Sequence, residues 1–430
     1  MIKIIDANSK AEYLELDRIK KRGQGENGVA DSVKKIIDDV KTYGDKALFE
    51  YALKFDKAEI KNLKVTKKEI EEAYNNVSKE LIKALKNAYK NIFDFHSKQI
   101  KNEYKLKDKF GSVTGRRVLP LKRVGIYVPG GTAAYPSSVL MNAIPATVAG
   151  VKETVMITPC GKDGKISDNI LAAAKICDIK EIYKSGGAGA IAALAFGTQS
   201  IEPVDKITGP GNIFVSTAKT LVSDMVGTDM PAGPSEILIV ADETANPEFL
   251  AADLLSQAEH DALASAILIS TNREISEKTA KIVRKMTDES KRRDIIEKSI
   301  ENYGLIINVE NVDEGIKLSN YFAPEHLELC TEKNEEDLEK VESAGSVFLG
   351  NWTPESVGDY YCGTNHILPT CGTARFCSGL STEDFVKHIT FTKYTKNSLI
   401  NSSNDIEIIA ESEGLYAHSN AVKVRTKNEV

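Results

Sequence analysis

The sequence lacks the features that mark membrane, secreted and nucleic-acid-binding proteins. No apolar run within its 430 residues is long enough to cross a membrane. Residues Met1–Asp6 lack the charged region, apolar region and cleavage site of a signal peptide. The formal net charge is −6, so no basic excess favours nucleic acid. We therefore expect neither a membrane nor a nucleic acid as partner.

Cys-x-x-Cys pairs are also absent. The six cysteines, at positions 160, 177, 330, 362, 371 and 377, are too irregularly spaced to indicate a zinc knuckle or a redox dithiol. Reduced thiols are the simplest explanation, and they predict a cytoplasmic location.

Two familiar cofactor motifs are missing as well. No turn has the full Gly-x-Gly-x-x-Gly spacing followed by an acidic residue about twenty positions later. No two histidines have the His-Glu-x-x-His spacing of a helical zinc site. Any metal site must therefore combine ligands that are distant in sequence.

The composition is that of a globular protein, with 42% hydrophobic and 27% charged residues. A chain of this length predicts two or more domains. Residues 1 to about 110 are expected to be helical. From Ser32 to Phe55 the apolar residues follow a 3.6-residue period that is interrupted at Gly44. A second amphipathic helix should start after Thr66, which forms a capping box with Glu69, and continue to His96.

After residue 110 short apolar strands alternate with helices. Strands are predicted at 124–128, 153–158 and 181–183, and glycine-rich turns at 130–131, 186–189 and 209–211. This alternation predicts a parallel, doubly wound α/β unit. Glycine-rich turns place backbone N–H groups at helix N-termini, where phosphates bind. The same turns also occur as tight connections that bind nothing.

A second α/β unit is predicted from residue 236 onward. Its helix after strand 236–240 should be capped by Asn246, with Pro247 in the first position, and should reach about Asp261. The further expectations are a strand at 266–270, one charged helix to about Ser299, a strand at 304–309, a helix at 312–320, a strand at 346–349, a long loop at 350–377 and a mainly helical segment at 382–430.

The stretch Ala323-Pro-Glu-His-Leu327 places a carboxylate beside an imidazole. Because proline favours the first position of a helix, we expect Glu325 and His326 in the first turn of a helix that begins at Pro324. The helix dipole would favour an ionised Glu325 and a neutral His326, which suits the removal of protons. A helix start with an ordinary Glu and a half-buried His is the alternative.

Five of the six histidines lie in the second half, and four of them, at 260, 326, 366 and 418, are expected in turns or at helix ends near acidic residues. This scatter is compatible with a metal site assembled in space. Gln257 and His260 are three residues apart, which predicts one shared helix face. A helix-end salt bridge at His260, an Asx turn at Asp359 and an interface histidine at His418 are the alternatives. Cys362 could act as a nucleophile with His366 as its base, or be a small buried hydrophobe.

Taken together, these stretches resemble the histidinol dehydrogenase family. The resemblance is carried, in the family's order, by residues 123–131, 135–141, 209–212, 229–236, 256–261, 323–328, 356–359, 365–366, 368–370 and 413–418. It implies an α/β fold of two incomplete Rossmann-like, doubly wound units, as in aldehyde dehydrogenase, with small terminal segments.

The domains implied by this resemblance are an N-terminal segment (1–23), a main α/β domain with the catalytic and metal residues (24–126 and 235–380), a Rossmann-like NAD-binding domain (127–234) and a C-terminal helical segment (381–430). The last segment would cross to the partner of a homodimer with shared active sites. The implied reaction is the last step of histidine biosynthesis, in which L-histidinol is oxidised through L-histidinal to L-histidine with NAD.

The family also implies roles for individual residues. His326 would be the base in both oxidations, and Glu325 would activate the water that hydrates the aldehyde. One zinc per subunit would be bound by Gln257, His260, Asp359 and His418. The substrate contacts would be Ser235, Gln257, His260, His326, Asp359, His366, Glu413 and His418, and the NAD contacts Tyr127, Gly189 and Asn212.

Two positions depart from the family pattern. Gly189 stands where the family has a glutamine, which predicts weaker NAD binding, and Thr364 stands where many relatives have proline. Nothing in the family pattern requires Cys362. Three alternatives to histidinol oxidation are another small alcohol as substrate, a zinc hydrolase with Glu325 as its base, and a binding protein without turnover.

Overall fold

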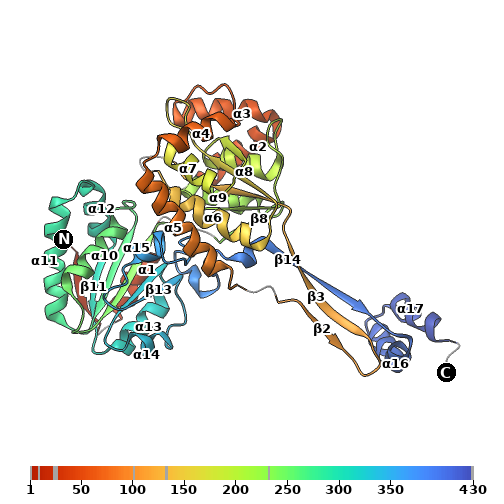
Figure 1. The fold of residues 1–430 in the computed structure, drawn as a ribbon. Helices are drawn as coiled ribbons and strands as arrows, with labels where there is room; N and C mark the ends of the chain where they lie inside the picture. The colour runs from red at the N-terminus through yellow and green to blue at the C-terminus, as the bar shows by residue number, and fades with distance from the viewer. Residues whose placement is uncertain are drawn as a thin grey trace. The chain divides into compact units, whose positions relative to one another are not determined.

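A computed structural model describes residues 2–7, 10–22, 28–99, 102–130, 134–230 and 233–427. The chain divides into two compact units (Figure 1). The larger unit consists of Met1–Gln99 and Leu121–Phe385, and the smaller of Ile100–Pro120 and Val386–Val430. In the described ranges, no helix combines the length and the apolar character needed to cross a membrane.

The larger unit contains a six-stranded parallel sheet with the strand order β1-β11-β10-β9-β12-β13. Its strands are β1 (Lys3–Asp6), β9 (Glu236–Ala241), β10 (Ser265–Ser270), β11 (Gly304–Asn308), β12 (His326–Cys330) and β13 (Ser346–Leu349). Helices cover both faces, so β9, β10 and β11 are mainly apolar instead of alternating between apolar and polar residues.

The two faces of this sheet belong to two separate cores. Ile237 and Ile239 of β9 pack with α10 (Pro247–Ala258), α11 (Arg273–Glu289) and α12 (Arg293–Tyr303). Leu238 and Val240 pack with α1 (Ala11–Lys20) and α13 (Val312–Phe322). The short helix α14 (Asn334–Leu338) connects β12 to β13. The strand order reverses between β9 and β12, which makes their junction a topological switch point.

The larger unit also contains a five-stranded parallel sheet with the order β6-β5-β4-β7-β8. Its strands are β4 (Arg123–Tyr127), β5 (Glu153–Thr158), β6 (Glu181–Lys184), β7 (Lys206–Thr208) and β8 (Gly227–Thr228). The crossover helices are α6 (Pro136–Ala149), α7 (Asp168–Ile176), α8 (Gly187–Phe196) and α9 (Ile213–Val222). Here the strand order reverses between β4 and β7.

Helices from the first hundred residues surround this second sheet. They are α2 (Val29–Tyr43), α3 (Asp45–Tyr51), one π-helical turn η1 (Ala52–Asp56), α4 (Lys67–Asn76) and α5 (Lys79–His96). Apolar residues of α2 and α3 join α8 and α9 in one buried cluster. The N-terminal helices are therefore part of the same packed body as the sheet.

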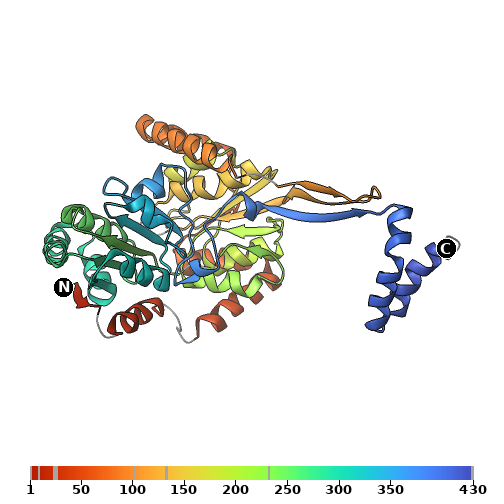
Figure 2. The same ribbon diagram turned by 90° about the horizontal axis from the view of Figure 1, so that it is seen from below.

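The smaller unit is an antiparallel sheet with a helical pair. β3 (Val113–Pro120) pairs with both β2 (Tyr104–Lys107) and β14 (Val386–Lys393). α16 (Lys396–Ser412) and α17 (Tyr416–Thr426) contact each other at the C-terminal end of the chain (Figure 2). Ser398 at the start of α16 is buried and hydrogen-bonded to Ser112 and Asp108.

The predictions from local signals are confirmed. The Thr66–Glu69 capping box is formed, Asn246 caps α10 with Pro247 in its first turn, and α2 ends at Gly44. The strands predicted between residues 124 and 349 are present within about two residues, the usual uncertainty of such boundaries. The predicted glycine turn at 130–131 is described only at Gly130. Residues 23–27, at the predicted first domain boundary, lie outside the described residues.

Several predictions about longer segments are wrong. The first 110 residues contain β1 and β2, because short edge strands are stabilised by distant partners and not by a local pattern. The helix predicted for 66–96 is two helices separated by an extended Val77 and Ser78. The helix predicted up to Ser299 breaks at the extended Ser290. The predicted loop 350–377 contains α15 (Glu355–Tyr360) and a 3-10 turn at Thr373–Arg375. The segment from 382 is mainly helical, as predicted, but it starts with a 3-10 turn and β14.

Candidate active site

Glu325 and His326 do not lie in a helix. α13 ends at Phe322, Ala323 adopts a left-handed conformation (φ 55°), and His326 is the first residue of β12. Pro324 therefore follows a helix end, a position where proline is also common. The predicted helix start is wrong, and with it the argument that a helix dipole keeps His326 neutral.

Instead, the pair is held by the neighbouring strand β9. The main-chain N–H of Glu236 donates to Glu325 Oε2 (2.9 Å), and the main-chain oxygen of Glu236 lies 3.0 Å from His326 Nδ1. Because a carbonyl oxygen can only accept, Nδ1 carries a proton, and Nε2 faces Asp359 Oδ1 at 3.3 Å. Both residues are buried. The pair thus lies at the amino ends of β9 and β12, the edge opposite the carboxyl ends where open parallel sheets usually bind ligands.

The electrostatics of the pair are coupled. Burial raises the pKa of Glu325 to about 8. Burial acts to lower the pKa of His326, but the carboxylates of Glu325, Asp359 and Glu355 outweigh it and raise this pKa well above its usual value. Burial acts to raise the pKa of Asp359, and the hydrogen bond from His326 reverses the shift and lowers it. His326 is therefore a strong proton acceptor.

Gln257 and His260 do not share a helix face, because α10 ends at Ala258. Gln257 is fully buried, and its amide nitrogen donates to the Glu355 carboxylate while its oxygen accepts from the Glu236 N–H (3.1 Å). His260 is half-buried beyond the helix end. Burial lowers the pKa of His260, opposed by the charge of Asp359.

Asp359 connects the remaining site residues. It lies in α15, and its main-chain oxygen accepts from His366 Nδ1 at 3.0 Å. Burial lowers the pKa of His366, and Asp359, His326 and His260 all influence it electrostatically. The structure thus brings together His260, His326, His366 and Asp359 from four separate segments.

No group of three or more His, Cys, Asp or Glu arranged to hold a metal is found among the described residues. Of the predicted zinc ligands, the larger unit contains only one imidazole, His260, one carboxylate, Asp359, and the amide of Gln257. Zinc accepts imidazole and carboxylate ligands, so His260 and Asp359 have suitable chemistry, whereas the amide oxygen of Gln257 already accepts from the Glu236 N–H. His418 in α17 and Glu413 at the end of α16 belong to the smaller unit, where both are exposed.

The predicted NAD contacts lie at the carboxyl edge of the five-stranded sheet. Tyr127 ends β4 and is buried, and its hydroxyl accepts from the Gly187 N–H at 3.2 Å. Burial raises the pKa of Tyr127 to about 12. Gly209 follows β7 with φ 121°, and a Cβ there would collide with the Tyr127 carbonyl. Asn212 caps α9 through its side-chain oxygen, which accepts from Phe214 N–H at 3.1 Å.

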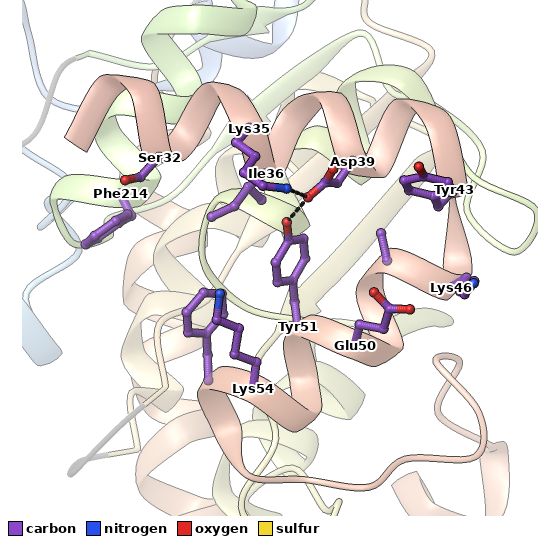
Figure 3. A pocket seen from close by; sticks show the side chains of 12 residues that line it. Ser32, Lys35, Ile36, Asp39, Tyr43, Lys46, Glu50, Tyr51, Lys54 and Phe214 are labelled. Atoms are coloured by element: carbon purple, nitrogen blue, oxygen red, sulfur yellow. Dashed lines mark hydrogen bonds and ion pairs between the residues drawn. The ribbon is translucent and has the colours of Figure 1, made fainter. Parts of the chain in front are cut away.

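A groove lies between α2 and α3, close to these residues (Figure 3). Its volume is about 820 Å³, and it includes Phe214 of α9. Within it, Lys35 and the Tyr51 hydroxyl both donate to Asp39 (2.7 and 2.5 Å). Gly189 in α8 is buried, and a Cβ there would lie 3.7 Å from Tyr51 and 3.5 Å from Leu48.

Cys362 is exposed, so the prediction of a small buried hydrophobe at this position is wrong. Its sulfur lies 3.1 Å from the Thr364 hydroxyl. The sequence interpretation also missed Glu236, Glu355 and Arg22, whose side chains are buried around the Glu325–His326 pair. Of these three residues, only Glu236 could have been found from the sequence, because it is a charged residue at the start of an otherwise apolar strand.

Two doubly wound parallel sheets, with a buried carboxylate–imidazole pair on one and glycine turns on the other, place the chain among the doubly wound α/β proteins. The family model described as histidinol dehydrogenase matches residues 19–426. The chain therefore belongs to the histidinol dehydrogenase family, whose members are NAD-dependent oxidoreductases of histidine biosynthesis.

Similar proteins match almost the whole chain. A histidinol dehydrogenase of Clostridium acetobutylicum is 51% identical over 99% of this chain and 99% of its own. One of Lactococcus lactis is 47% identical over 99% of each chain. The crystal structure of histidinol dehydrogenase from Elizabethkingia anophelis superposes with a TM-score of 0.95 at 43% identity, covering 99% of this chain and 98% of that chain. The predicted α/β class with doubly wound units is confirmed.

Proposed function

We propose that this protein is a zinc-dependent dehydrogenase that oxidises L-histidinol through L-histidinal to L-histidine, the last step of histidine biosynthesis, with NAD as the oxidant. One observation carries the proposal. His326 is buried with Nδ1–H bound to a main-chain carbonyl and Nε2 directed at the Asp359 carboxylate, so that Nε2 is the ring nitrogen that can exchange a proton. Glu325 beside it is a second buried acceptor.

His326 would take the alcohol proton at Nε2 while the Nδ1–H bond to Glu236 holds the ring and spreads the developing positive charge. NAD, when bound, accepts the hydride. Glu325, in its ionised form, would then take a proton from the water that adds to the aldehyde, because a raised pKa makes that form a stronger base than an exposed carboxylate. His326 would act again in the second oxidation, after its proton has left to solvent.

Gln257, His260 and Asp359 would hold zinc together with the partner subunit's His418. Zinc, when bound, holds the imidazole and amino nitrogens of the substrate, which accounts for specificity because zinc binds imidazole nitrogen well. Ser235, His366 and the partner subunit's Glu413 would bind the rest of the substrate. His366 is oriented for this by its bond to the Asp359 carbonyl.

NAD would bind across the carboxyl ends of β4 and β7, between Tyr127 and Asn212. Ligands of open parallel sheets bind at such switch points, where the strand order reverses. The glycine turn before α9 brings N–H groups to this edge. The groove beside Phe214 would take the adenosine half, with Asp39 as an acceptor for hydroxyl groups.

An NAD reduction assay tests the proposed activity. We expect NADH formation with L-histidinol, and at most weak turnover with amino alcohols and diols that lack an imidazole. A chelator should abolish the activity, and added zinc should restore it. Cys362→Ser should keep full activity, which would remove the thiol mechanism. Faster NADH formation with an alcohol that lacks an imidazole would contradict L-histidinol as the substrate. Hydrolysis without NADH formation would support a zinc hydrolase instead.

The homodimer with shared sites has its own test. His326→Ala and His418→Ala enzymes should each be inactive. After mixing and subunit exchange, about a quarter of the wild-type activity should return, since half of the dimers are mixed and one of their two sites is complete. No recovery despite proven exchange would mean that both histidines act within one chain.

A further inference from the structure

Glu236 contacts both members of the Glu325–His326 pair. Its main-chain N–H donates to the Glu325 carboxylate (2.9 Å), and its main-chain oxygen accepts from His326 Nδ1 (3.0 Å). Its carboxylate in turn accepts from the main-chain N–H groups of Glu325 (3.3 Å) and Cys371 (3.0 Å). One residue thus determines where both acceptors lie.

This arrangement carries an electrostatic cost. The Glu236 side chain has no exposed surface, and it lies beside a second buried carboxyl, that of Glu325. A buried carboxylate without a partner is strongly destabilising. Arg22 provides the partner, with its Nη1 atom 3.0 Å from Glu236 Oε1 and no exposed surface of its own.

Arg22 does more than neutralise this charge. Its Nη2 donates to the main-chain oxygens of Pro234 and Ser235 (both 3.1 Å), and its Nε donates to that of Leu263 (2.7 Å). The planar guanidinium therefore binds three consecutive residues, 234 to 236, just where β9 starts. A lysine can supply the charge but not this fixed fork of donors.

We propose that Arg22 is a positioning residue for the reaction. By binding residues 234 to 236 it holds the main chain of Glu236 in the one place where its N–H meets Glu325 and its oxygen meets His326. The proposal rests on the proposed roles of Glu325 and His326. Arg22 is 214 positions before Glu236 in sequence, and no sequence motif links the two.

Three variants separate positioning from simple stability. Arg22→Met removes both charge and fork, Arg22→Lys keeps the charge, and Glu236→Gln keeps the shape of the carboxylate. We expect kcat with L-histidinol to fall about a hundredfold in Arg22→Met, the usual effect of a misplaced catalytic group, with a much smaller change in KM. Arg22→Lys should recover the melting temperature but only part of kcat.

The double variant Arg22→Met/Glu236→Gln should regain part of the kcat lost in Arg22→Met, because no unpaired buried carboxylate remains. Arg123→Met is the matched control. Arg123 is also buried and ion-paired, to Glu153 (3.0 Å) and Glu181 (2.7 Å), but it lies at the amino end of β4. The Arg123→Met variant should have a lower melting temperature, and the kcat of the folded enzyme should be unchanged.

A second readout does not depend on turnover. In protein labelled with ¹⁵N-histidine, which has only six histidines, the His326 resonances should show a protonated Nδ1 in the wild type and a tautomer mixture in Arg22→Lys. His326→Gln assigns the signals. Wild-type kcat and an unchanged His326 tautomer in Arg22→Lys and in Glu236→Gln would overturn the proposal. A wild-type enzyme that does not oxidise L-histidinol would instead overturn the proposed function, while the tautomer result would still test Arg22.

Discussion

Lys219 and Asp229 form a buried ion pair that holds Gly209 from both sides. Lys219 Nζ donates to the Gly209 carbonyl (2.9 Å), and Asp229 accepts from the Gly209 N–H (2.7 Å). Both side chains are buried. Because Gly209 also approaches the Tyr127 carbonyl too closely for any Cβ, the pair maintains the turn where NAD is proposed to bind.

Asp229→Asn should therefore weaken both stability and NAD binding. Removing one partner of a buried ion pair costs about 3–5 kcal/mol of unfolding free energy. Denaturant unfolding measures this loss, and calorimetric titration with NAD measures the affinity. Arg273→Met, which removes the exposed ion pairs to Asp6 and Glu277, is the control and should cost less than about 1 kcal/mol. Unchanged NAD affinity in a stable Asp229→Asn protein would argue against a role of this turn in NAD binding.

The two acceptors of the catalytic pair should separate kinetically. His326→Ala should slow both oxidations by about 10²–10⁴-fold, the usual contribution of a general base. Glu325→Gln should allow the first oxidation and impair the second, so that L-histidinal accumulates. Single-turnover measurements of NADH distinguish one equivalent from two. If both variants lose the same step to the same degree, the proposed division of roles is wrong.

Gly189 should respond to restoration of the family's glutamine. A side chain at this position has room, because its Cβ would be in ordinary contact with Leu48 and Tyr51. Gly189→Gln should lower the dissociation constant for NAD in a calorimetric titration of the substrate-free enzyme. Gly189→Ala is the control, because alanine stabilises a helix by about 0.5–1 kcal/mol relative to glycine but supplies no amide. Equal affinities of the Gln and Ala variants would mean that the amide is not used.

Asp56 should introduce a pH dependence of stability. Burial raises the pKa of Asp56 from 3.8 to about 6. The folded state thus binds a proton more tightly than the unfolded state, and this contribution to stability is full below about pH 4 and is lost as the pH rises to about 6. Asp56→Asn lacks this loss. Its melting temperature relative to the wild type should rise across this window, and a constant difference would contradict the shift.

Local signals determined much of the fold. The Thr66 capping box and the Asn246-Pro247 helix start depend on hydrogen bonds within a few residues, so the sequence predicts them correctly. The unbroken apolar run of β9 similarly predicts a strand covered on both faces. The resemblance to the histidinol dehydrogenase family, carried by ten short stretches, identified the family before any coordinates were considered.

The surroundings of the catalytic pair were decided only by tertiary structure. Proline is common both at the start of a helix and just after its end, so the sequence around Pro324 fits either. Packing of α13 onto the sheet selects the second, and pairing of β12 with β9 places His326 against Glu236, 90 positions away. The buried charge of Glu236 then requires Arg22. Contacts of this kind have no local pattern, because they arise where the chain returns to itself.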